Sequence, residues 1–391
     1  MYDVPRLRLA RSLVRTIRRG HPWVYRDALE GKIPPAGTEV ALVDARGRVV
    51  ARGLAEAGPI GVRLWAAHDE PIDEALIEQR IDVAIELRKR VTPKDTDALR
   101  LIHGEGDRMP GVVVDLYGPH AVLALDGDAA TSRRAQLVEL LRPRLHALGV
   151  PTILVRQGPR GERTVEHVEG PPPPEVVEVR EHGMVLCADL RRGQKTGLFL
   201  DQRLSRATVR RLARGKRVLD LYAYVGGFSV AAGKGGASEV VTVDVAKPAI
   251  ALAERTWAAN GLPAGRQRAI AADVPDYLTA AAEEGERFDL IVADPPSFAP
   301  SAATREKALR AYEKLHLACL RVLSPGGLLL AASCSSHVDR TAFEEALARA
   351  AEERRVVLQV IDRWAAPPDH PRLLAFPEGD YLTVTLARVV P

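Results

Sequence analysis

The sequence predicts an α/β protein in which a small β-barrel and a small α/β domain precede a larger domain with a mostly parallel, seven-stranded sheet. The 391 residues exceed the roughly 250–300 at which a single hydrophobic core stops growing. Strand-like runs dominate the beginning of the chain, whereas strands alternate with helices at its end. The proline run 171–174 between these regions is typical of a linker, because proline fits neither a helix interior nor a central strand.

Residues 1–70 are predicted to form the β-barrel because they are rich in glycine and proline and contain short strand-like runs. These runs are Thr38–Val43, Arg48–Leu54 and Gly61–Trp65. Residues 71–174 are predicted to form the small α/β domain, which begins with an amphipathic helix over Ile72–Arg90. Two strands, a helix and two further strands are expected after it, at 111–116, 121–125, 129–148, 152–156 and 164–169.

Residues 175–391 are predicted to form the larger domain. The apolar, strand-like runs are 217–221, 240–245, 268–272, 289–293, 327–332, 356–361 and 381–388. Helix-like segments separate the earlier runs, at 229–232, 247–260, 274–284 and 303–323. This alternation predicts a parallel sheet with helices on both faces, and such sheets bind ligands beyond the carboxyl ends of their strands.

Positive charge is concentrated in two runs, although the net charge of the chain is only +4. Residues 1–26 contain seven arginines and one acid, which gives 7 − 1 = +6. Residues 203–217 contain seven basic side chains and no acid. Because the planar guanidinium group makes paired hydrogen bonds to phosphate, these runs suggest a nucleic-acid partner. Solvated helix faces are the alternative interpretation.

The sequence indicates a cytoplasmic protein without a membrane segment or a metal site. No apolar run approaches the ~18 residues that a membrane-spanning helix needs. The first residues lack the apolar stretch of a secretory signal. The three cysteines, Cys187, Cys319 and Cys334, are too few and too scattered for a disulfide framework or a zinc site. We therefore expect reduced thiols and no bound metal.

A glycine turn follows the first strand of the larger domain, and an acid ends the second strand. Asp220 precedes Gly226 and Gly227, and Asp244 comes 244 − 220 = 24 residues after Asp220. The glycines do not form the G-x-G-x-x-G pattern that cradles a pyrophosphate. S-adenosylmethionine contains adenosine but no phosphate, so it needs the tight turn and an acid for its ribose. The predicted cofactor site comprises Asp220, Tyr222, Gly226, Gly227, Phe228, Asp244, Asp273 and Asp294.

This interpretation of the turn has a structural alternative. Glycines can simply turn the chain, and acids can cap helices. We favour a cofactor site because Asp220, Asp244, Asp273 and Asp294 all fall near the carboxyl ends of predicted strands.

The fourth and fifth strands end in motifs that can carry chemistry. Asp294 is followed by Pro295 and Pro296, which stiffen the backbone, and by Phe298, which offers a stacking face for a base. An ordinary strand exit is the alternative, because Asp-Pro is common in turns. Cys334 stands between serines at the end of the fifth strand and is expected to lie opposite Asp294 with an accessible thiol. The remaining cysteines, 187 and 319, are interpreted as core residues.

Five motifs along the chain resemble those of one enzyme family. Residues 20–25 (Gly-His-Pro-Trp-Val-Tyr) resemble the opening of a PUA domain, an RNA-binding β-barrel. Residues 104–111 resemble a motif of a small central α/β domain of EEHEE type, and residues 195–203 resemble the entry into a Rossmann-like class I methyltransferase domain. Residues 369–371 and 376–378 also match. The family is that of the RlmI-like bacterial large-subunit ribosomal RNA cytosine-5 methyltransferases, and the resemblance covers essentially the whole chain.

This resemblance implies a cofactor, partners and residue roles. The cofactor would be S-adenosylmethionine and the partner 23S ribosomal RNA, with a homodimer as a candidate assembly. Asp294 would bind the substrate base and Cys334 would be the nucleophile. Gln202 and Arg203 join the predicted cofactor site, and Arg203 and Lys195 are candidates for the cation near the thiol. The predicted contacts with the base and the RNA are Pro295, Pro296, Phe298, Lys195, His21, Arg18 and Arg19.

One departure from related enzymes concerns proton removal. Cytosine-5 enzymes outside this group carry a second cysteine in the Asp-Pro-Pro region, which assists product release. Here that region holds no cysteine, and only Ser297 lies nearby. The resemblance therefore implies a single-cysteine mechanism and leaves open which group removes the carbon-5 proton.

Two other functions remain open from the sequence alone. N-methylation of an exocyclic amine of an RNA purine would use Asp-Pro-Pro and an aromatic residue, but it needs no cysteine, so Cys334 argues against it. A non-catalytic RNA-binding or ribosome assembly factor could keep a vestigial cofactor fold. The intact Gly226, Gly227, Asp244, Asp294 and Cys334 argue against that interpretation.

Overall fold

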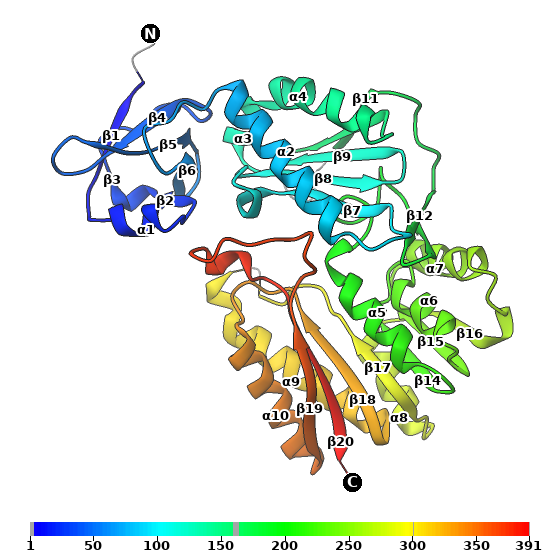
Figure 1. The fold of residues 1–391 in the computed structure, drawn as a ribbon. Helices are drawn as coiled ribbons and strands as arrows, with labels where there is room; N and C mark the ends of the chain where they lie inside the picture. Colours follow the sequence, from blue (N-terminus) through cyan, green and yellow to red (C-terminus); the bar gives the residue numbers. More distant parts are fainter. Residues whose placement is uncertain (1–3, 159–163, 300, 391) are drawn as a thin grey trace. The chain divides into compact units, whose positions relative to one another are not determined.

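The structure is a computed structural model that describes residues 4–158, 164–299 and 301–390. Its contacts divide the chain into two compact units, and Figure 1 labels helices and strands of both. The first unit comprises Met1–Val177, Asp189–Gly197 and Pro368–Gly379. The second unit comprises Glu178–Ala188, Leu198–Pro367 and Asp380–Pro391. Two short segments from later in the chain therefore belong to the first unit, which the sequence did not indicate.

The first unit begins with a six-stranded, barrel-like sheet in the order β2-β6-β5-β4-β1-β3. The strands are β1 (Arg6–Leu9), β2 (Trp23–Tyr25), β3 (Leu29–Glu30), β4 (Glu39–Val43), β5 (Val49–Ala55) and β6 (Ile60–Ala66), and the short helix α1 covers Val14–Arg18. Leu42, Val62 and Ile17 lie in the shared apolar core. The predicted strands correspond to β4, β5 and β6. The sequence missed β1 to β3 because two to four residues are too short for an alternating pattern to appear.

A five-stranded sheet follows in the order β11-β10-β9-β8-β7. Its elements are α2 (Glu74–Val91), β7 (Ala98–His103), β8 (Val112–Tyr117), β9 (His120–Leu125), α3 (Asp128–Ser132), α4 (Arg134–Ala147), β10 (Thr152–Gln157) and β11 (Thr164–Glu169). Asp73 caps α2 by accepting the Leu76 N–H at 2.9 Å. The edge strand β7 was not predicted, and the single helix expected over 129–148 is divided at Arg133.

The second unit contains the predicted mostly parallel, seven-stranded sheet, in the order β16-β15-β14-β17-β18-β20-β19. Its strands are β14 (Arg217–Leu221), β15 (Glu239–Asp244), β16 (Gln267–Ala271), β17 (Phe288–Ala293), β18 (Leu323–Ser333), β19 (Val357–Trp364) and β20 (Thr383–Val390). The first five strands pair in parallel, and β20 is antiparallel to both β18 and β19. A two-stranded sheet of β12 (Val177–Glu181) and β13 (Met184–Ala188) precedes them and was not predicted.

Helices cover both faces of this sheet, as the alternation predicts. One face carries α5 (Arg203–Leu212), α6 (Gly227–Lys234) and α7 (Lys247–Ala259), with Val209, Val230 and Trp257 in one core. The other carries α8 (Val274–Glu283), α9 (Arg305–Val322) and α10 (Arg340–Arg354), and Tyr312 and Phe343 lie in that core. The carboxyl ends of β14, β15, β17 and β18 therefore lie at one edge of the sheet.

Within the described residues, no helix is long and apolar enough to cross a bilayer. The domain boundaries expected at residues 70 and 174 stay predictions.

Candidate active site

The turn after β14 is held by a buried carboxylate. Asp220 has no exposed surface, and its Oδ2 accepts hydrogen bonds from the Ser229 N–H at 2.9 Å and the Ser229 hydroxyl at 2.6 Å. The Ser229 hydroxyl also lies 2.7 Å from Thr242 Oγ1 in β15. These contacts fasten the first turn of α6 to the ends of two neighbouring strands.

The backbone of this turn adopts costly conformations. Tyr222 and Tyr224 have φ values of 58° and 48°, in the left-handed region that residues other than glycine avoid and that is found at functional sites. Gly226 has a φ of +72°, and a Cβ there would lie 2.8 Å from Ala253 Cβ of α7. A Cβ on Gly227 would lie 3.0 Å from Arg206 Cδ. Gly226 is therefore required where the sequence placed the tight turn, whereas a side chain at Gly227 would need a small shift of Arg206.

The charge of Asp220 fits a cationic cofactor. Burial above all, and also the Asp294 and Asp244 carboxylates, raise the pKa of Asp220 to about 7. Its Oδ1 has no hydrogen-bond partner among the described residues. A bound cation would favour the ionised carboxylate. S-adenosylmethionine carries a sulfonium and an ammonium group, so this side chain suits that cofactor.

The two other acids of the predicted cofactor site differ in their surroundings. Asp244 is half-buried at the end of β15, and its two oxygens accept the backbone N–H groups of Tyr224 and Ala246 at 2.9 and 2.8 Å. Each carboxylate oxygen has two lone pairs, so Asp244 keeps capacity for ribose hydroxyls. Asp273 is exposed and caps α8 by accepting the Asp276 N–H at 3.4 Å.

The predicted aromatic members of the cofactor site lie in or against the core. Phe228 is 6% exposed and belongs to the core under α5, α6 and α7. Tyr222 packs against the core on the other face of the sheet, and burial raises the pKa of its phenol. Tyr222 is half-buried, so part of its surface remains accessible beside the glycine turn.

Asp294 and Cys334 follow neighbouring strands. Ala293 of β17 pairs with Ala331 of β18, so the segments that follow both strands emerge at the same edge of the sheet. Cys334 Sγ lies 4.0 Å from the Pro295 carbonyl oxygen, and both Asp294 and Cys334 are half-buried. The geometry brings together the two residues that the sequence expected to lie opposite each other.

The loop that follows Asp294 contains both buried and exposed residues. Pro295 is buried and Pro296 is exposed. The Phe298 ring is half-buried, with its centroid 4.9 Å from that of Tyr312 in α9. Part of the stacking face expected on Phe298 is therefore occupied by another aromatic ring.

The two remaining cysteines are enclosed by the fold. Cys187 in β13 and Cys319 in α9 have no exposed surface, and none of the three cysteines is in a disulfide. Burial raises the pKa of Cys319 to about 12 and also raises the pKa of Cys187. Cys334 is thus the one half-buried thiol of the three.

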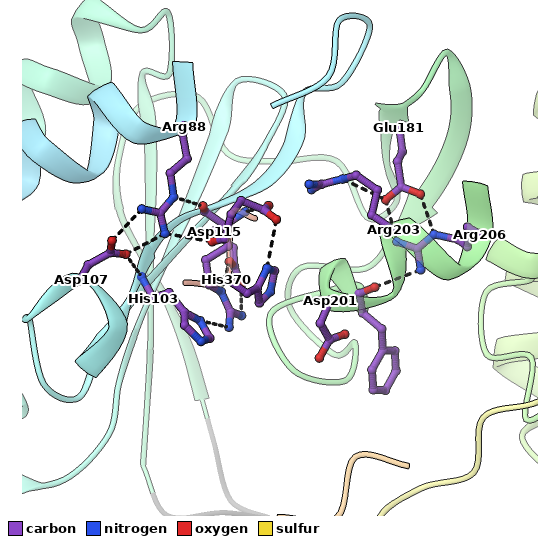
Figure 2. Close-up of polar contacts among 12 residues, drawn as sticks. Arg88, His103, Asp107, Asp115, Glu181, Asp201, Arg203, Arg206 and His370 are labelled. Atoms are coloured by element: carbon purple, nitrogen blue, oxygen red, sulfur yellow. Dashed lines mark hydrogen bonds and ion pairs between the residues drawn. The ribbon is translucent and has the colours of Figure 1, made fainter. Parts of the chain in front are cut away.

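Gln202 and Arg203 lie in a buried polar cluster at the start of α5. The Glu181 carboxylate binds the Arg206 guanidinium through two hydrogen bonds of 2.6 Å, and Figure 2 shows Glu181 between Arg203 and Arg206. Arg203 Nε lies 3.6 Å from Glu181 Oε2. Gln202 is also buried and accepts the Ser205 hydroxyl at 2.6 Å. Arg203, a candidate cation for the thiol, therefore shares the single negative charge of Glu181 with Arg206.

The expected basic face over residues 203–217 is wrong for three of its seven basic side chains, Arg203, Arg206 and Arg217. Arg203 and Arg206 are 2% and 4% exposed. Arg217 forms ion pairs with Glu239 at 2.5 Å and Glu286 at 2.7 Å. The acids that neutralise this run come from other parts of the chain, so a count of charges along the run could not show them. Arg211 and Arg214 remain exposed.

Lys195 lies in the first unit, beside a buried polar network. It has a φ of 51°. Its neighbour Thr196 donates its hydroxyl to Asp115 at 2.5 Å and contacts the Tyr117 hydroxyl at 2.8 Å. Asp115 also accepts from Arg100 at 2.7 Å. The network holds the segment around Lys195 against β8.

A second polar cluster of the first unit contains the motif at residues 369–371. Arg88 makes two hydrogen bonds of 2.7 Å to Asp107 and a third of 2.9 Å to the Asp369 carbonyl. The Asp369 carboxylate accepts the backbone N–H of Arg100 and contacts His370 Nδ1. Figure 2 shows Arg88, Asp107 and His370 in this cluster. This motif therefore packs within the first unit.

A cavity of about 300 Å³ lies beside α1 in the first unit. Three of the predicted RNA-contacting residues, Arg18, Arg19 and His21, line it together with Trp65 and Arg108. Both Arg18 and Arg19 are exposed. The other described residues that line it, Ile17, Gly20, Pro22, Leu64, Ala66, Ala67, His68 and Leu373, include no acid. The cavity is therefore suited to an anionic ligand.

Comparisons with known proteins agree with this architecture. Residues 134–377 match the model of the S-adenosylmethionine-dependent methyltransferase family, and residues 7–66 match that of PUA-like domains. Ribosomal RNA large subunit methyltransferase I of Erwinia tasmaniensis is 36% identical over 98% of this chain and 99% of its own. The protein of that name from Escherichia coli strain HS is also 36% identical, over 98% of this chain and 99% of its own.

Solved structures share the fold of the whole chain. A candidate SAM-dependent methyltransferase from Streptococcus mutans covers 99% of this chain, which covers 100% of it in turn, with a TM-score of 0.88 and 24% identity. A second structure, of a candidate methyltransferase in complex with SAH, covers the same shares with a TM-score of 0.89. These matches, together with the glycine turn and the acids at the strand ends, show that the chain belongs to the S-adenosylmethionine-dependent methyltransferases, in the family of ribosomal RNA large subunit methyltransferase I.

Proposed function

We propose that this methyltransferase forms 5-methylcytosine in 23S ribosomal RNA through a covalent bond between Cys334 and the target cytosine. The observation that supports this reaction most directly is the position of the thiol. Cys334 Sγ lies 4.0 Å from the Pro295 carbonyl oxygen, beside Asp294 at the carboxyl edge of the sheet. The large-subunit RNA is proposed because relatives with 36% identity over nearly the full length carry that substrate in their name.

A thiol is needed because carbon-5 of cytosine is a poor nucleophile. The Cys334 thiolate would add to carbon-6, forming a C–S bond and moving the electron pair of the C5–C6 double bond onto carbon-5. S-adenosylmethionine, when bound, would supply the methyl group from its sulfonium to carbon-5, and neutral S-adenosylhomocysteine would be the leaving group. Loss of the carbon-5 proton then restores the double bond as the C–S bond breaks, and Cys334 leaves as a thiolate. An N-methyltransferase would need no such residue.

Asp294 would hold the base during this addition. A carboxylate next to two prolines has a restricted backbone, and its oxygens can accept the N4 amino group or share a proton with N3. Proton sharing at N3 would reduce the negative charge that builds up in the adduct. The base must leave its stack to reach this site, at a cost of roughly a few kcal/mol.

The PUA-like domain would contribute affinity for the RNA. Arg18, Arg19 and His21 line the cavity beside α1, and no acid is among the described residues that line it. Arginine contacts with phosphate give salt-dependent affinity with little sequence preference. A cytoplasmic location and assembly into a homodimer stay predictions.

Covalent trapping tests the proposed reaction. The probe is 23S ribosomal RNA transcribed with 5-fluorocytidine triphosphate in place of cytidine triphosphate, because fluorine at carbon-5 prevents the final proton loss. Wild-type protein with S-adenosylmethionine should give a protein–RNA complex that survives denaturation. Cys187→Ala and Cys319→Ala serve as controls and should trap RNA as well, since both thiols are buried.

Cys334→Ala should give no trapped complex and should still bind S-adenosylmethionine in a calorimetric titration. If Cys334→Ala retains methylation of unmodified RNA, the carbon-5 mechanism is wrong, and methylation of an exocyclic amine becomes the better interpretation. If neither protein binds the cofactor, a non-catalytic role would be favoured.

A further inference from the structure

A buried tyrosine connects the two loops that carry the proposed chemistry. Tyr312 in α9 has no exposed surface, and its hydroxyl lies 2.8 Å from Ser333 Oγ and 3.0 Å from Ser335 Oγ. These serines stand immediately before and after Cys334. One phenol therefore holds both neighbours of the cysteine.

The contacts continue from Ser335 to the loop that follows Asp294. Ser335 Oγ lies 3.1 Å from Ser297 Oγ and accepts the Ala299 N–H at 3.3 Å. On the other side, Ser333 Oγ accepts the Ser335 N–H at 3.3 Å. The four hydroxyls form one chain from the core to the half-buried Ser297.

The hydroxyl hydrogens are sufficient for all three hydrogen bonds between the four hydroxyl groups of this chain. Each hydroxyl has one hydrogen, so Ser333 can donate to Tyr312, Tyr312 to Ser335, and Ser335 to Ser297. Burial raises the pKa of the Tyr312 phenol, which keeps its proton available for donation. A buried network in which every hydroxyl group has a hydrogen-bond partner holds its side chains in one geometry.

We propose that Tyr312 is a positioning residue, which sets the placement of the Cys334 thiol relative to Asp294 by hydrogen-bonding the serines on either side of it. This inference rests on the proposed covalent reaction. The two loops reach the same edge of the sheet on separate strands, and the backbone pairing of β17 with β18 ends at Ala293 and Ala331, before either residue. Beyond that point, side-chain bonds through Ser335 tie the loops together, and Tyr312 orients Ser335.

The aromatic surroundings allow the hydroxyl to be tested separately from the ring. The Tyr312 ring packs against Phe298 at 4.9 Å, Phe343 at 5.1 Å and His316 at 6.1 Å between centroids. Tyr312→Phe keeps a ring for these contacts and removes only the hydroxyl. Tyr117→Phe is a matched control, because Tyr117 is also fully buried and its hydroxyl bonds a side-chain hydroxyl, that of Thr196.

The test measures the rate of covalent trapping on the 5-fluorocytidine-containing 23S RNA under single-turnover conditions. Tyr312→Phe should lower this rate by about 10- to 100-fold, because small misplacements of reacting groups have effects of that size. Its affinity for S-adenosylmethionine should stay within about twofold of wild type, since the hydroxyl binds Ser333 and Ser335, which are outside the predicted cofactor site. Tyr117→Phe should trap at close to the wild-type rate.

Two further measurements separate positioning from general structural damage. Alkylation of Cys334 by iodoacetamide without RNA should proceed at nearly the wild-type rate in Tyr312→Phe, because a small molecule needs no alignment with Asp294. Ser335→Ala combined with Tyr312→Phe should slow trapping about as much as the stronger single variant, since both break one chain.

The outcomes are distinguishable. Unchanged trapping in Tyr312→Phe would overturn the positioning role, and so would an alkylation rate that falls as much as the trapping rate. Multiplicative effects in the double variant would also contradict it. The proposed function fails separately, if the wild-type protein traps no RNA or if Cys334→Ala still methylates.

Discussion

The carboxylate of Asp244 accepts the backbone N–H of Tyr224 at 2.9 Å and thereby fixes a residue whose φ is 48°. The second oxygen of Asp244 accepts the Ala246 N–H at 2.8 Å. A single side chain at the end of β15 thus holds the turn after β14 and the entry to α7. Asp244 is expected to serve cofactor binding in two ways, by offering lone pairs to the ribose and by keeping the turn in its unfavourable conformation.

Replacing Asp244 should therefore lower the cofactor affinity by more than the loss of one hydrogen bond alone would lower it. We expect Asp244→Ala to lower S-adenosylmethionine affinity at least about 10-fold, because a hydrogen bond to a charged group contributes about 1.5–3 kcal/mol. Asp73→Ala is the control, since Asp73 is also an exposed helix cap and lies outside the predicted cofactor site. Calorimetric titration gives both affinities, and circular dichroism checks the fold. An unchanged affinity in Asp244→Ala would remove this residue from the cofactor site.

Cofactor binding should depend on pH through Asp220. The pKa of its carboxyl is raised from 3.8 to about 7, so its attraction for a cation develops as the pH rises through 7 and is lost as the pH falls below it. S-adenosylmethionine affinity should rise between about pH 6 and about pH 8, and Asp220→Asn should flatten this dependence while lowering affinity at the higher pH. Titrations at several pH values provide the measurement. A wild-type affinity that does not change with pH would contradict this role of Asp220.

Alkylation of the native protein should select one cysteine. The Cys334 thiol is half-buried, whereas Cys187 and Cys319 have no exposed surface and have pKa values raised by burial. Iodoacetamide at about pH 8 should modify Cys334 at least about 10-fold faster than the others, because the thiolate is the reactive form. Peptide mass spectrometry would quantify each site, and urea-unfolded protein is the control in which all three should react. Comparable labelling of Cys319 in native protein would contradict the buried assignment.

The Glu181–Arg206 pair should matter more for stability than any surface ion pair. Both side chains are buried and share two hydrogen bonds of 2.6 Å. Arg206→Met would leave Glu181 buried without this partner, so we expect a loss of about 3–5 kcal/mol in the free energy of unfolding. Arg349→Met, which removes a 41% exposed partner of Glu313, is the control and should cost less than about 1 kcal/mol. Similar losses in urea unfolding would contradict this ranking.

RNA affinity should depend on the cavity beside α1. Arg18→Ala combined with Arg19→Ala should weaken binding of 23S RNA fragments and reduce the slope of log affinity against log salt by about one unit for each phosphate that the two arginines neutralise. Arg48→Ala is the control, because Arg48 is exposed in the same domain and already pairs with Asp44 at 2.8 Å. Filter binding at several salt concentrations would compare them. Equal effects of the double variant and the control would mean that the cavity has no special role.

The order of elements in the second unit could be predicted from the sequence because it depends on local patterns. Apolar runs alternate with amphipathic segments, and this alternation specifies a parallel sheet and its ligand-binding edge. Glycine allows backbone conformations that other residues avoid, and proline restricts the backbone at its own position. The sequence therefore predicts the turn at Gly226 and the stiff segment after Asp294.

Which side chains are ion-paired, buried or hydrogen-bonded to one another depends on contacts between distant parts of the chain. Glu181 lies 25 residues from Arg206, and Tyr312 lies 23 residues from Ser335. The Trp23 ring meets Phe376 at 4.6 Å between centroids. These contacts form because distant segments of the chain fold against each other, and local sequence patterns do not reveal such contacts. Local sequence patterns therefore predict the sheet and its candidate motifs, whereas tertiary packing establishes which charges remain unpaired and how Cys334 is held.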